Sequence, residues 1–404
     1  MLDHRRRFCT RLLITSTCLV TFQAYLVAPL APGLSSDLRT SSFALSFSIP
    51  CFAISFALSS FFSSLFIEHI NKKKYLTGIL VCITLSLLCI TASDNVGFFL
   101  FMRVLTGFLC GCLVQLSIFI TYHIFHNAER EQAFDWLILA QATGMTFGPT
   151  AGICLYVYLG WRWQFIALAA WSFLATLSSF NKKYEFTIPY YKPLAWNHTI
   201  KKCRNIFKNA NAKKMYVFVY LTGVFHSGLF VWISAYLINR CHFGNEEIGF
   251  ALLLFSLPGL LMAIPIAKTI QKNGFNRMVL QGLLVVASGI FILVTNTVLW
   301  LVIFAIAILS IGYVMTQPFY IGVINSVYKQ KTSGLSHGIG FGLLFIGYGT
   351  GPILFNFLNS YGILEPTMMI ILLEILLAWL SVTSNLKAPD LFIQKATEGG
   401  NITV

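Results

Sequence analysis

Charged side chains are scarce in this chain. They make up 10% of its 404 residues, whereas hydrophobic side chains make up 57%, and the mean hydropathy is +0.75. A soluble protein of this length has to keep its own surface in water and cannot bury so much apolar area. The composition therefore excludes a soluble globular protein and indicates that the lipid bilayer supplies most of the solvent.

The signatures of enzymes and metal centres are also missing. The sequence contains no His-Glu-x-x-His pair, no cluster of paired carboxylates and no phosphate-binding loop. Most of the ten cysteines lie in apolar runs, where cysteine behaves as a small hydrophobic residue. Cys110 and Cys112 are two residues apart, which on a helix turns them to different faces and prevents a shared metal site. We expect no enzymatic activity, no cofactor, no bound metal and no structural disulfide.

Twelve apolar runs follow one another along the chain. A spanning helix needs roughly 20 apolar residues, and these runs do not alternate in polarity as the strands of a membrane barrel would. The runs begin near Arg11, Ser42, Tyr75, Phe98, Phe134, Arg162, Met215, Ile248, Met278, Leu299, Leu335 and Pro366. The sequence thus predicts an all-α membrane protein with a helix for each run.

The basic residues are concentrated at alternate ends of the predicted helices. If the N-terminus lies in the cytoplasm, 24 of the 28 Lys and Arg residues fall at cytoplasmic ends, and nine of them lie between Lys182 and Lys214. Only Arg39, Arg162 and Arg240 fall on the outer side, in agreement with the positive-inside rule. We therefore interpret the net charge of +14 as a topology signal that also contacts anionic lipid. It indicates cytoplasmic termini and no nucleic-acid partner.

One long polar segment, residues 181–214, interrupts the apolar runs. It predicts a basic cytoplasmic linker between an N-terminal six-helix bundle (1–180) and a C-terminal six-helix bundle with a short tail (215–404). A pattern of small residues and proline, which lets helix backbones touch and can kink them, occurs in both halves. Its two copies are Gly144-x-x-x-Gly148-Pro149-x-x-Gly152 and Gly347-x-x-x-Gly351-Pro352. Such related halves are a known transporter plan, with the substrate site between them near the middle of the bilayer.

A charged loop links the second and third runs. Residues 64–73 place an acid at Glu68, an asparagine at Asn71 and a basic pair at Lys72 and Lys73. A solvated loop that its lysines keep on one side is the simpler alternative.

A single arginine lies inside the fourth run. Arg103 precedes Gly107 in an Arg-x-x-x-Gly pattern, and a charge within a spanning helix costs a few kcal/mol or more. The guanidinium is therefore either functional or able to snorkel to the outer interface, about 8 Å away at 1.5 Å per residue.

With the loop, the arginine pattern and the glycine–proline pattern, the chain resembles the major facilitator superfamily over nearly its whole length. It looks most like the twelve-helix drug/proton antiporter branch of the Bcr/CflA type. The resemblance implies that the charged loop bridges the halves on the cytoplasmic side, that Arg103 takes part in proton coupling, and that the pattern in the fifth run marks an exporter. In the loop pattern of the family, Asn71 takes the place of a glycine that turns with a positive φ, which asparagine tolerates better than most residues. Many members of this branch carry an acid in the first helix, whereas residues 12–30 contain none.

Acidic residues are rare within the apolar runs. Of the fourteen, only Glu374 lies deep in such a run. A lone buried carboxyl stays neutral unless it is paired, so Glu374 is a candidate proton carrier, and a carboxyl that another helix holds by a hydrogen bond is the alternative. Asp37, near the outer end of the first run, is the second candidate, with a simple loop charge as its alternative.

Polar and aromatic side chains on several runs could line a central cavity. Each could instead form an interhelical hydrogen bond worth about 0.6 kcal/mol. The candidates are Gln23, Tyr25, Gln115, Gln141, His226, Trp232, Tyr313, Gln317, His337 and Asn356.

These observations lead to the hypothesis of proton-coupled export of a small organic molecule by alternating access. Its partners would be the substrate, protons and membrane lipid, and the protein would be a monomer in a bacterial inner membrane. A uniporter, or a metabolite or siderophore carrier working in either direction, is the alternative within transport. A membrane enzyme or sensor is the alternative outside it.

Overall fold

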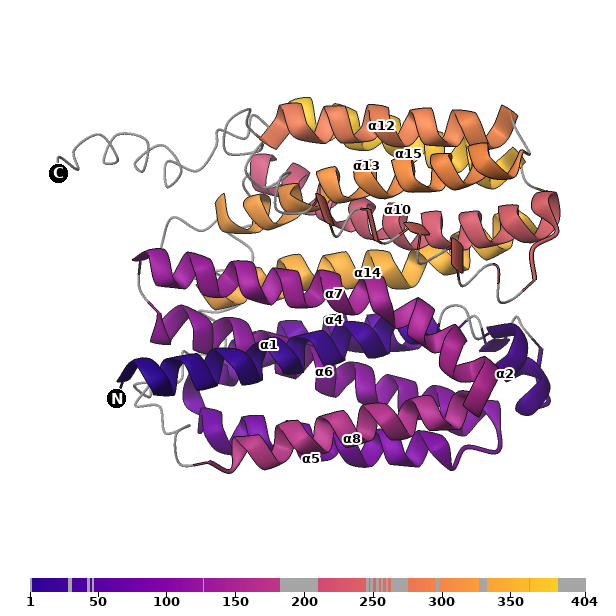
Figure 1. Ribbon diagram of the computed structural model, residues 1–404. Helices are drawn as coiled ribbons and strands as arrows, with labels where there is room; N and C mark the ends of the chain where they lie inside the picture. Colours follow the sequence, from indigo (N-terminus) through magenta and orange to yellow (C-terminus); the bar gives the residue numbers. More distant parts are fainter. Residues whose placement is uncertain are drawn as a thin grey trace, which may run out of the picture.

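The helices of the protein coincide with the apolar runs of the sequence (Figure 1). The computed structural model describes residues 2–27, 31–41, 44–45, 47–125, 127–181, 210–244, 247, 250–251, 254–255, 257–258, 261–262, 275–295, 298–326, 333–362 and 364–383. The long helices are α1 (Leu2–Leu26), α4 (Ser48–Phe66), α5 (Lys72–Thr91), α6 (Val96–Ile124), α7 (Asn127–Leu159), α8 (Trp161–Ser179), α10 (Ala210–Cys241), α12 (Phe275–Thr295), α13 (Leu299–Ser326), α14 (Ser333–Asn359) and α15 (Leu364–Thr383). Two short elements, α2 (Ala31–Asp37) and η2 (Ile67–His69), lie in the connections.

The all-α prediction is confirmed, and the described part of the chain contains no strand. Each predicted run has its helix except the one that begins near Ile248, which lies mostly outside the described residues. Eight of the described helices are long and apolar enough to cross a membrane. The helix count of the sequence is therefore consistent with the structure.

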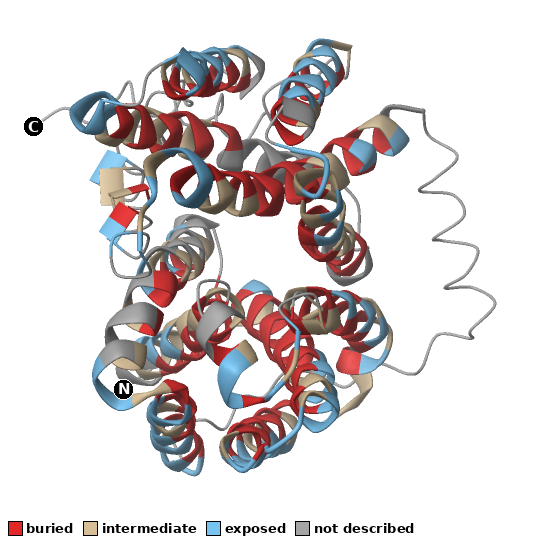
Figure 2. Cartoon of the chain, turned by 90° about the vertical axis from the view of Figure 1, so that its right-hand side faces the viewer, coloured by how far each residue is buried: buried red, intermediate tan, exposed pale blue. Residues whose placement is uncertain are grey.

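Apolar side chains cover the outside of the helix assembly. In Figure 2 the buried faces of the helices point inward and the exposed faces point outward. Leu284, Phe291 and Trp300 are 71%, 68% and 77% exposed. A water-soluble monomer rarely presents contiguous apolar surface, so this is the outer face of a protein solvated by lipid.

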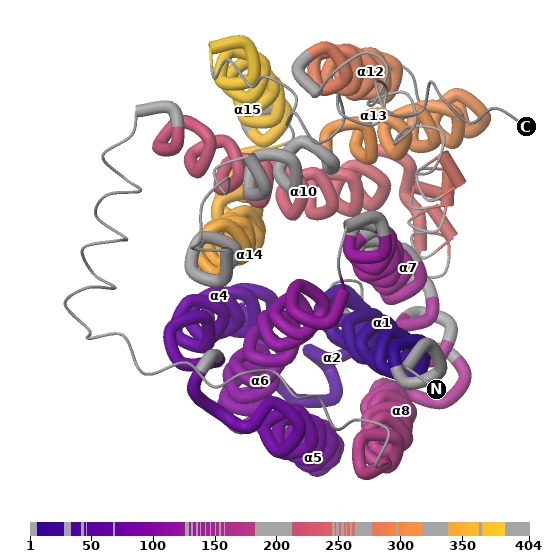
Figure 3. The backbone as a smooth tube through the Cα atoms, turned by 90° about the vertical axis from the view of Figure 1, so that its left-hand side faces the viewer, coloured from indigo at the N-terminus to yellow at the C-terminus, as the bar shows by residue number. Residues whose placement is uncertain are grey.

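The helices lie in two groups, which Figure 3 shows end-on. Helices α1 to α8 lie together in the lower group, and α10 to α15 lie together in the upper one. The helix α8 ends at Ser179 and α10 begins at Ala210, and residues 182–209 of the expected linker lie outside the described residues. The boundaries at 180 and 214 stay predictions.

In each group the repeated glycine pattern brings one pair of helices into backbone contact. A Cβ atom added at Gly144 of α7 would lie 2.6 Å from the carbonyl oxygen of Cys18 in α1. One added at Gly351 of α14 would lie 2.8 Å from the carbonyl oxygen of Val224 in α10. Such distances are too short for a real carbon atom, so the observed helix separation requires glycine. The two copies of the sequence pattern therefore form equivalent contacts, α1 with α7 and α10 with α14.

The remaining members of the pattern extend the first of these contacts. A Cβ atom at Gly148 would lie 2.9 Å from the carbonyl oxygen of Phe22, and one at Gly152 would lie 2.7 Å from that of Leu26. Both prolines of the pattern, Pro149 and Pro352, are buried inside their helices.

The two groups meet along α4 and α14, and small residues of α14 allow the close approach. At one end of α14, a Cβ atom at Gly338 would lie 2.7 Å from the hydroxyl oxygen of Ser64. Eleven residues further along, one at Gly349 would lie 3.4 Å from Pro50 at the other end of α4. The contact therefore runs along nearly the whole length of α4.

The loop between α4 and α5 differs from its prediction in one respect. Asn71 has φ −71° and ψ 107°, so the expected positive φ is wrong. Asn71 is instead the N-cap of α5, and its side-chain oxygen accepts a hydrogen bond of 3.0 Å from the backbone N–H of Lys74. An N-cap residue has an extended backbone and satisfies one of the free N–H groups at the helix start, a role for which asparagine is among the best residues.

The basic pair of this loop contacts its own half. The ammonium group of Lys72 is buried and lies 5.5 Å from the centre of the Phe119 ring of α6. Lys73 donates a hydrogen bond of 3.2 Å to the carbonyl oxygen of Asn181, after α8. Glu68 belongs to η2, and its side chain lies outside the description. The expected bridge between the halves stays a prediction.

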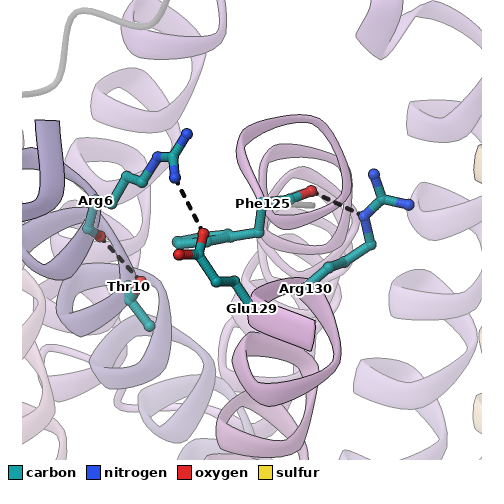
Figure 4. A network of polar contacts seen from close by, with 5 residues as sticks. All are labelled: Arg6, Thr10, Phe125, Glu129 and Arg130. Carbon is teal, nitrogen blue, oxygen red and sulfur yellow. Dashed lines mark hydrogen bonds and ion pairs between the residues drawn. The ribbon is translucent and has the colours of Figure 1, made fainter. Parts of the chain in front are cut away.

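An ion pair ties the beginnings of α1 and α7 together at the same end of the molecule (Figure 4). Arg6 donates to a carboxylate oxygen of Glu129 at 3.0 Å, and both side chains are well exposed. Next to it, Arg130 donates to the carbonyl oxygen of Phe125 at 2.9 Å and lies over the Tyr122 ring. Exposed pairs contribute about 0–1 kcal/mol, so these contacts position α7 more than they stabilise it.

The turn between α7 and α8 explains the Gly-Trp-Arg segment of the sequence. Gly160 has φ +83°, a conformation that other residues adopt only with strain. Trp161 is then fully buried with its ring edge-on to Phe99, 6.0 Å away. Arg162 donates to the carbonyl oxygens of Thr91 and Ser93 at the end of α5, at 3.1 and 3.2 Å. A cation is favourable at this helix terminus because the last carbonyl groups carry partial negative charge.

Candidate functional site

An aromatic cluster fills the region where the two groups of helices face each other. We use this name for Tyr25 of α1, His226 and Phe230 of α10, Tyr313 of α13 and Tyr348 of α14. The ring of Tyr25 lies 5.7 Å from that of Tyr348 and 6.1 Å from that of Phe230, so rings from both halves are in contact. His226 and Tyr313 have ring centres 3.9 Å apart, and the hydroxyl groups of Tyr313 and Tyr348 lie within 3.3 Å. Edge-on and offset aromatic contacts of this kind are worth about 0.5–1.5 kcal/mol each.

Further rings extend the aromatic cluster on both sides. Phe255 lies 5.0 Å from Phe230 and 5.7 Å from Tyr313. On the other side, Phe345 lies 5.7 Å from Tyr348 and stacks on Phe56 of α4 at 3.7 Å. A continuous aromatic surface therefore reaches from α4 to α13.

His226 is the polar residue at the centre of the cluster. It is 1% exposed, and its Nε2 lies 3.4 Å from the hydroxyl oxygen of Thr316. Among the described residues its Nδ1 has no hydrogen-bond partner. An unsatisfied buried polar atom costs about 1–3 kcal/mol, so this arrangement calls for an explanation.

Arg103 is fully buried inside the first half and does not snorkel. Its Nη1 donates to the backbone carbonyl oxygen of Gln23 at 3.4 Å, and its guanidinium carbon lies 4.5 Å from the centre of the Phe52 ring. The Nε and Nη2 atoms have no hydrogen-bond partner within the described chain. The side chain of Gln23 accepts a weak hydrogen bond from the thiol of Cys110 at 3.7 Å. The structure thus places a positive charge between α1, α4 and α6.

Glu374 lies on the buried face of α15. Its side chain is 7% exposed, and its Oε1 has no hydrogen-bond partner among the residues that the structure describes. Two helical turns earlier, Thr367 accepts a hydrogen bond of 2.9 Å from the indole N–H of Trp232 in α10. Because seven residues are two helical turns, Glu374 shares the face of α15 that contacts α10 at Thr367.

The other predicted site residues are dispersed. Gln115 is buried with an amide nitrogen that has no partner in the described part of the chain, whereas Gln141 and Asn356 are half-buried on α7 and α14. Asp37 is exposed at the end of α2. Gln317 and His337 lie on α13 and α14, but their side chains are outside the described set.

Of the predicted cavity residues, the structure brings together Tyr25, His226 and Tyr313. The sequence analysis missed Phe230 and Tyr348, which complete the aromatic cluster. Phe230 follows His226 by one helical turn, and Tyr348 lies between two glycines of the repeated pattern, so their spacing was the available signal.

Comparison with known proteins identifies the family. The family model of the Major Facilitator Superfamily matches residues 13–352. The chain belongs to this superfamily. Its members are transporters, so this facilitator-superfamily protein is an integral membrane transporter and not an enzyme.

Individual relatives of this facilitator-superfamily protein are distant. It is 22% identical over 368 residues to Multidrug resistance protein 2 of Bacillus subtilis, which covers 88% of this chain and 90% of the relative. It is 20% identical over 268 residues to an uncharacterised transporter of the superfamily from Methanocaldococcus jannaschii, covering 64% and 67%. Its fold is similar to the crystal structure of the human organic anion transporter MFSD10, with a TM-score of 0.74, 16% identity and coverage of 93% and 99%.

Proposed function

We propose that this transporter exports a small organic molecule in exchange for protons by alternating access. The observation that carries the proposal is the aromatic cluster, because the halves contribute facing rings to it. Rocking of one half against the other breaks the contacts of Tyr25 with Phe230 and Tyr348 and forms them again. A substrate seated among these rings is then exposed to one side of the membrane at a time. The name of the Bacillus subtilis relative supports export.

Glu374 and Arg103 are the proposed coupling residues. A carboxyl that is buried without a partner favours its neutral form, so Glu374 would take up a proton in the dry state and release it when water reaches it. Arg103 would act from the first half, where its buried charge lacks a carboxylate among the described residues. Asp37 is exposed, so burial does not favour its neutral form, and it is the weaker candidate for the proton carrier.

A proton-gradient assay in inverted membrane vesicles tests this function. Cationic dyes, siderophores and amino-acid derivatives are added one at a time, and we expect one of them to collapse the gradient. Glu374→Gln abolishes that response. Glu129→Gln is the matched control, because it removes an exposed carboxylate whose ion pair contributes about 0–1 kcal/mol. An unchanged response of the Glu374→Gln variant would show that Glu374 does not carry the proton.

Uniport is the second candidate, and the absence of an acidic residue from residues 12–30 favours it. A uniporter moves radiolabelled substrate down its own gradient without changing the pH of the vesicle, which separates it from an antiporter. In either case we place the protein as a monomer in a bacterial inner membrane with both termini in the cytoplasm.

A further inference from the structure

The hydrogen bonds around His226 determine which of its ring nitrogens carries a proton. The hydroxyl of Thr316 lies 2.7 Å from the carbonyl oxygen of Tyr313 and 3.4 Å from Nε2 of His226. A carbonyl oxygen can only accept, so the single hydroxyl hydrogen goes to the shorter and stronger of these contacts. The hydroxyl oxygen then accepts from His226, which requires a hydrogen on Nε2. In the neutral imidazole, Nδ1 is consequently a bare acceptor.

This bare acceptor is buried inside the aromatic cluster without a described partner. The titratable groups of neighbouring helices that contact the His226 ring are the phenols Tyr313 and Tyr348, whose hydroxyl groups lie beside each other. The carboxyl of Glu374 lies on α15, which contacts α10 at Trp232. The ring contacts and the hydrogen bond described for His226 include no carboxylate.

We propose that Nδ1 of His226 is the atom for which a proton and the substrate compete, and that the substrate is a planar aromatic molecule with an O–H or N–H donor. The inference rests on the proposed exchange of substrate for protons. The rings of the cluster hold the aromatic plane, and the bare Nδ1 accepts the donor of the substrate. A proton on Nδ1 turns the acceptor into a donor and adds a positive charge, so the substrate loses its hydrogen bond. Only one of the two can occupy the atom, which makes their binding mutually exclusive.

Binding of β-naphthol to the purified full chain tests this competition. β-Naphthol is a planar aromatic donor that stays neutral at every pH below about 8, so its binding can be followed through the whole acid range in which His226 could take up a proton. As the pH is lowered and His226 becomes protonated, we expect the affinity for β-naphthol to fall about tenfold for each further pH unit, because one proton excludes one ligand. The methyl ether of β-naphthol has the same rings without the donor, and we expect weak binding that is independent of pH. β-Naphthol also partitions into the detergent, but to the same extent for every variant, so differences in binding between variants do not contain this contribution.

Two substitutions at His226 separate the roles of its nitrogens. His226→Asn keeps an amide oxygen near the place of Nδ1 but cannot take up a proton in this range, so binding of β-naphthol persists and its pH dependence disappears. His226→Gln places its amide near Nε2 and leaves no acceptor at Nδ1, so binding is weak at every pH. If either variant fails to fold, the comparison of β-naphthol with its methyl ether across pH in the wild type still tests the competition, because only the donor-bearing ligand needs Nδ1.

Three outcomes would overturn the inference. Absence of β-naphthol binding by the wild type overturns the substrate class. Equal binding of β-naphthol and its ether overturns the hydrogen bond, and an unchanged pH dependence in His226→Asn overturns the competition. The vesicle assay distinguishes these from failure of the proposed function. If the wild type collapses the proton gradient but gives any of these three results, the proposed antiport stands and the inference about His226 fails. If the binding results are as expected but no compound collapses the gradient, His226 is a pH-sensitive binding residue of a uniporter.

Discussion

Gly144→Ala tests whether backbone contact between α1 and α7 holds the first half together. The new Cβ atom would meet Thr21, whose side chain can rotate, but also the carbonyl oxygen of Cys18 at 2.6 Å and the backbone nitrogen of Phe22 at 2.7 Å. An ordinary contact begins near 3.4 Å, so the two helices have to separate by about 0.8 Å. Overpacking of this size costs about 1–3 kcal/mol, from which the better helix propensity of alanine subtracts about 1 kcal/mol.

Gly78→Ala in α5 is the matched control. A Cβ atom at Gly78 would have no atom within 4 Å, so this variant gains helix propensity without a clash. We expect Gly144→Ala to melt below the wild type and Gly78→Ala to melt at or above it, with a difference in free energy of unfolding of about 1–3 kcal/mol between the two. Thermal unfolding of the purified full chain in detergent, followed by tryptophan fluorescence, measures both. Equal melting temperatures for the two variants would refute the argument that the helix separation requires glycine.

Two further predictions concern a buried charge and a helix cap. Arg103→Gln removes a charge whose burial costs several kcal/mol, so we expect the variant to melt at or above the wild-type temperature. We expect substrate transport in proteoliposomes to be lost. A lower melting temperature would indicate that Arg103 has a structural role instead. Asn71→Ala loses the cap of α5 and about 1 kcal/mol of stability, whereas Asn71→Gly loses only a few tenths, and chemical unfolding measures both. A gain of stability in Asn71→Gly would show that the position favours a positive φ after all.

The sequence was sufficient for features that depend on local chemistry. Apolar length predicts the helices, because a bilayer-spanning segment needs that length whatever its neighbours are. The glycine pattern containing Gly144 and Gly351 also predicts close helix contacts, although it does not say which helix lies opposite. Asn71 shows the limit of such reasoning, because asparagine suits both an N-cap and a positive φ, and the backbone decides between them.

The interior of the site required the structure. His226 and Thr316 are 90 residues apart, and the direction of the bond between them depends on a third atom, the carbonyl oxygen of Tyr313. No periodicity in the sequence encodes the rotation of α10 relative to α13. Arg103 is similar, because the same position in α6 suits a snorkelling side chain or a buried one, and contact with Gln23 and Phe52 distinguishes them.

The helix α14 carries glycine on two faces, and this has a kinetic consequence. Gly347 and Gly351 face α10, whereas Gly338 and Gly349 face α4 of the other half. Glycine therefore leaves both ends of the α4-facing surface of α14 without side chains, and Phe345, stacked on Phe56, lies between them. Under the proposed alternating access, α14 would have few interlocking side chains to separate from α4 when the halves move. Bulky residues at Gly338 or Gly349 would then slow the exchange between the two conformations more than they weaken either one. Under the proposed mechanism, the turnover number would then depend on how closely α14 packs against α4.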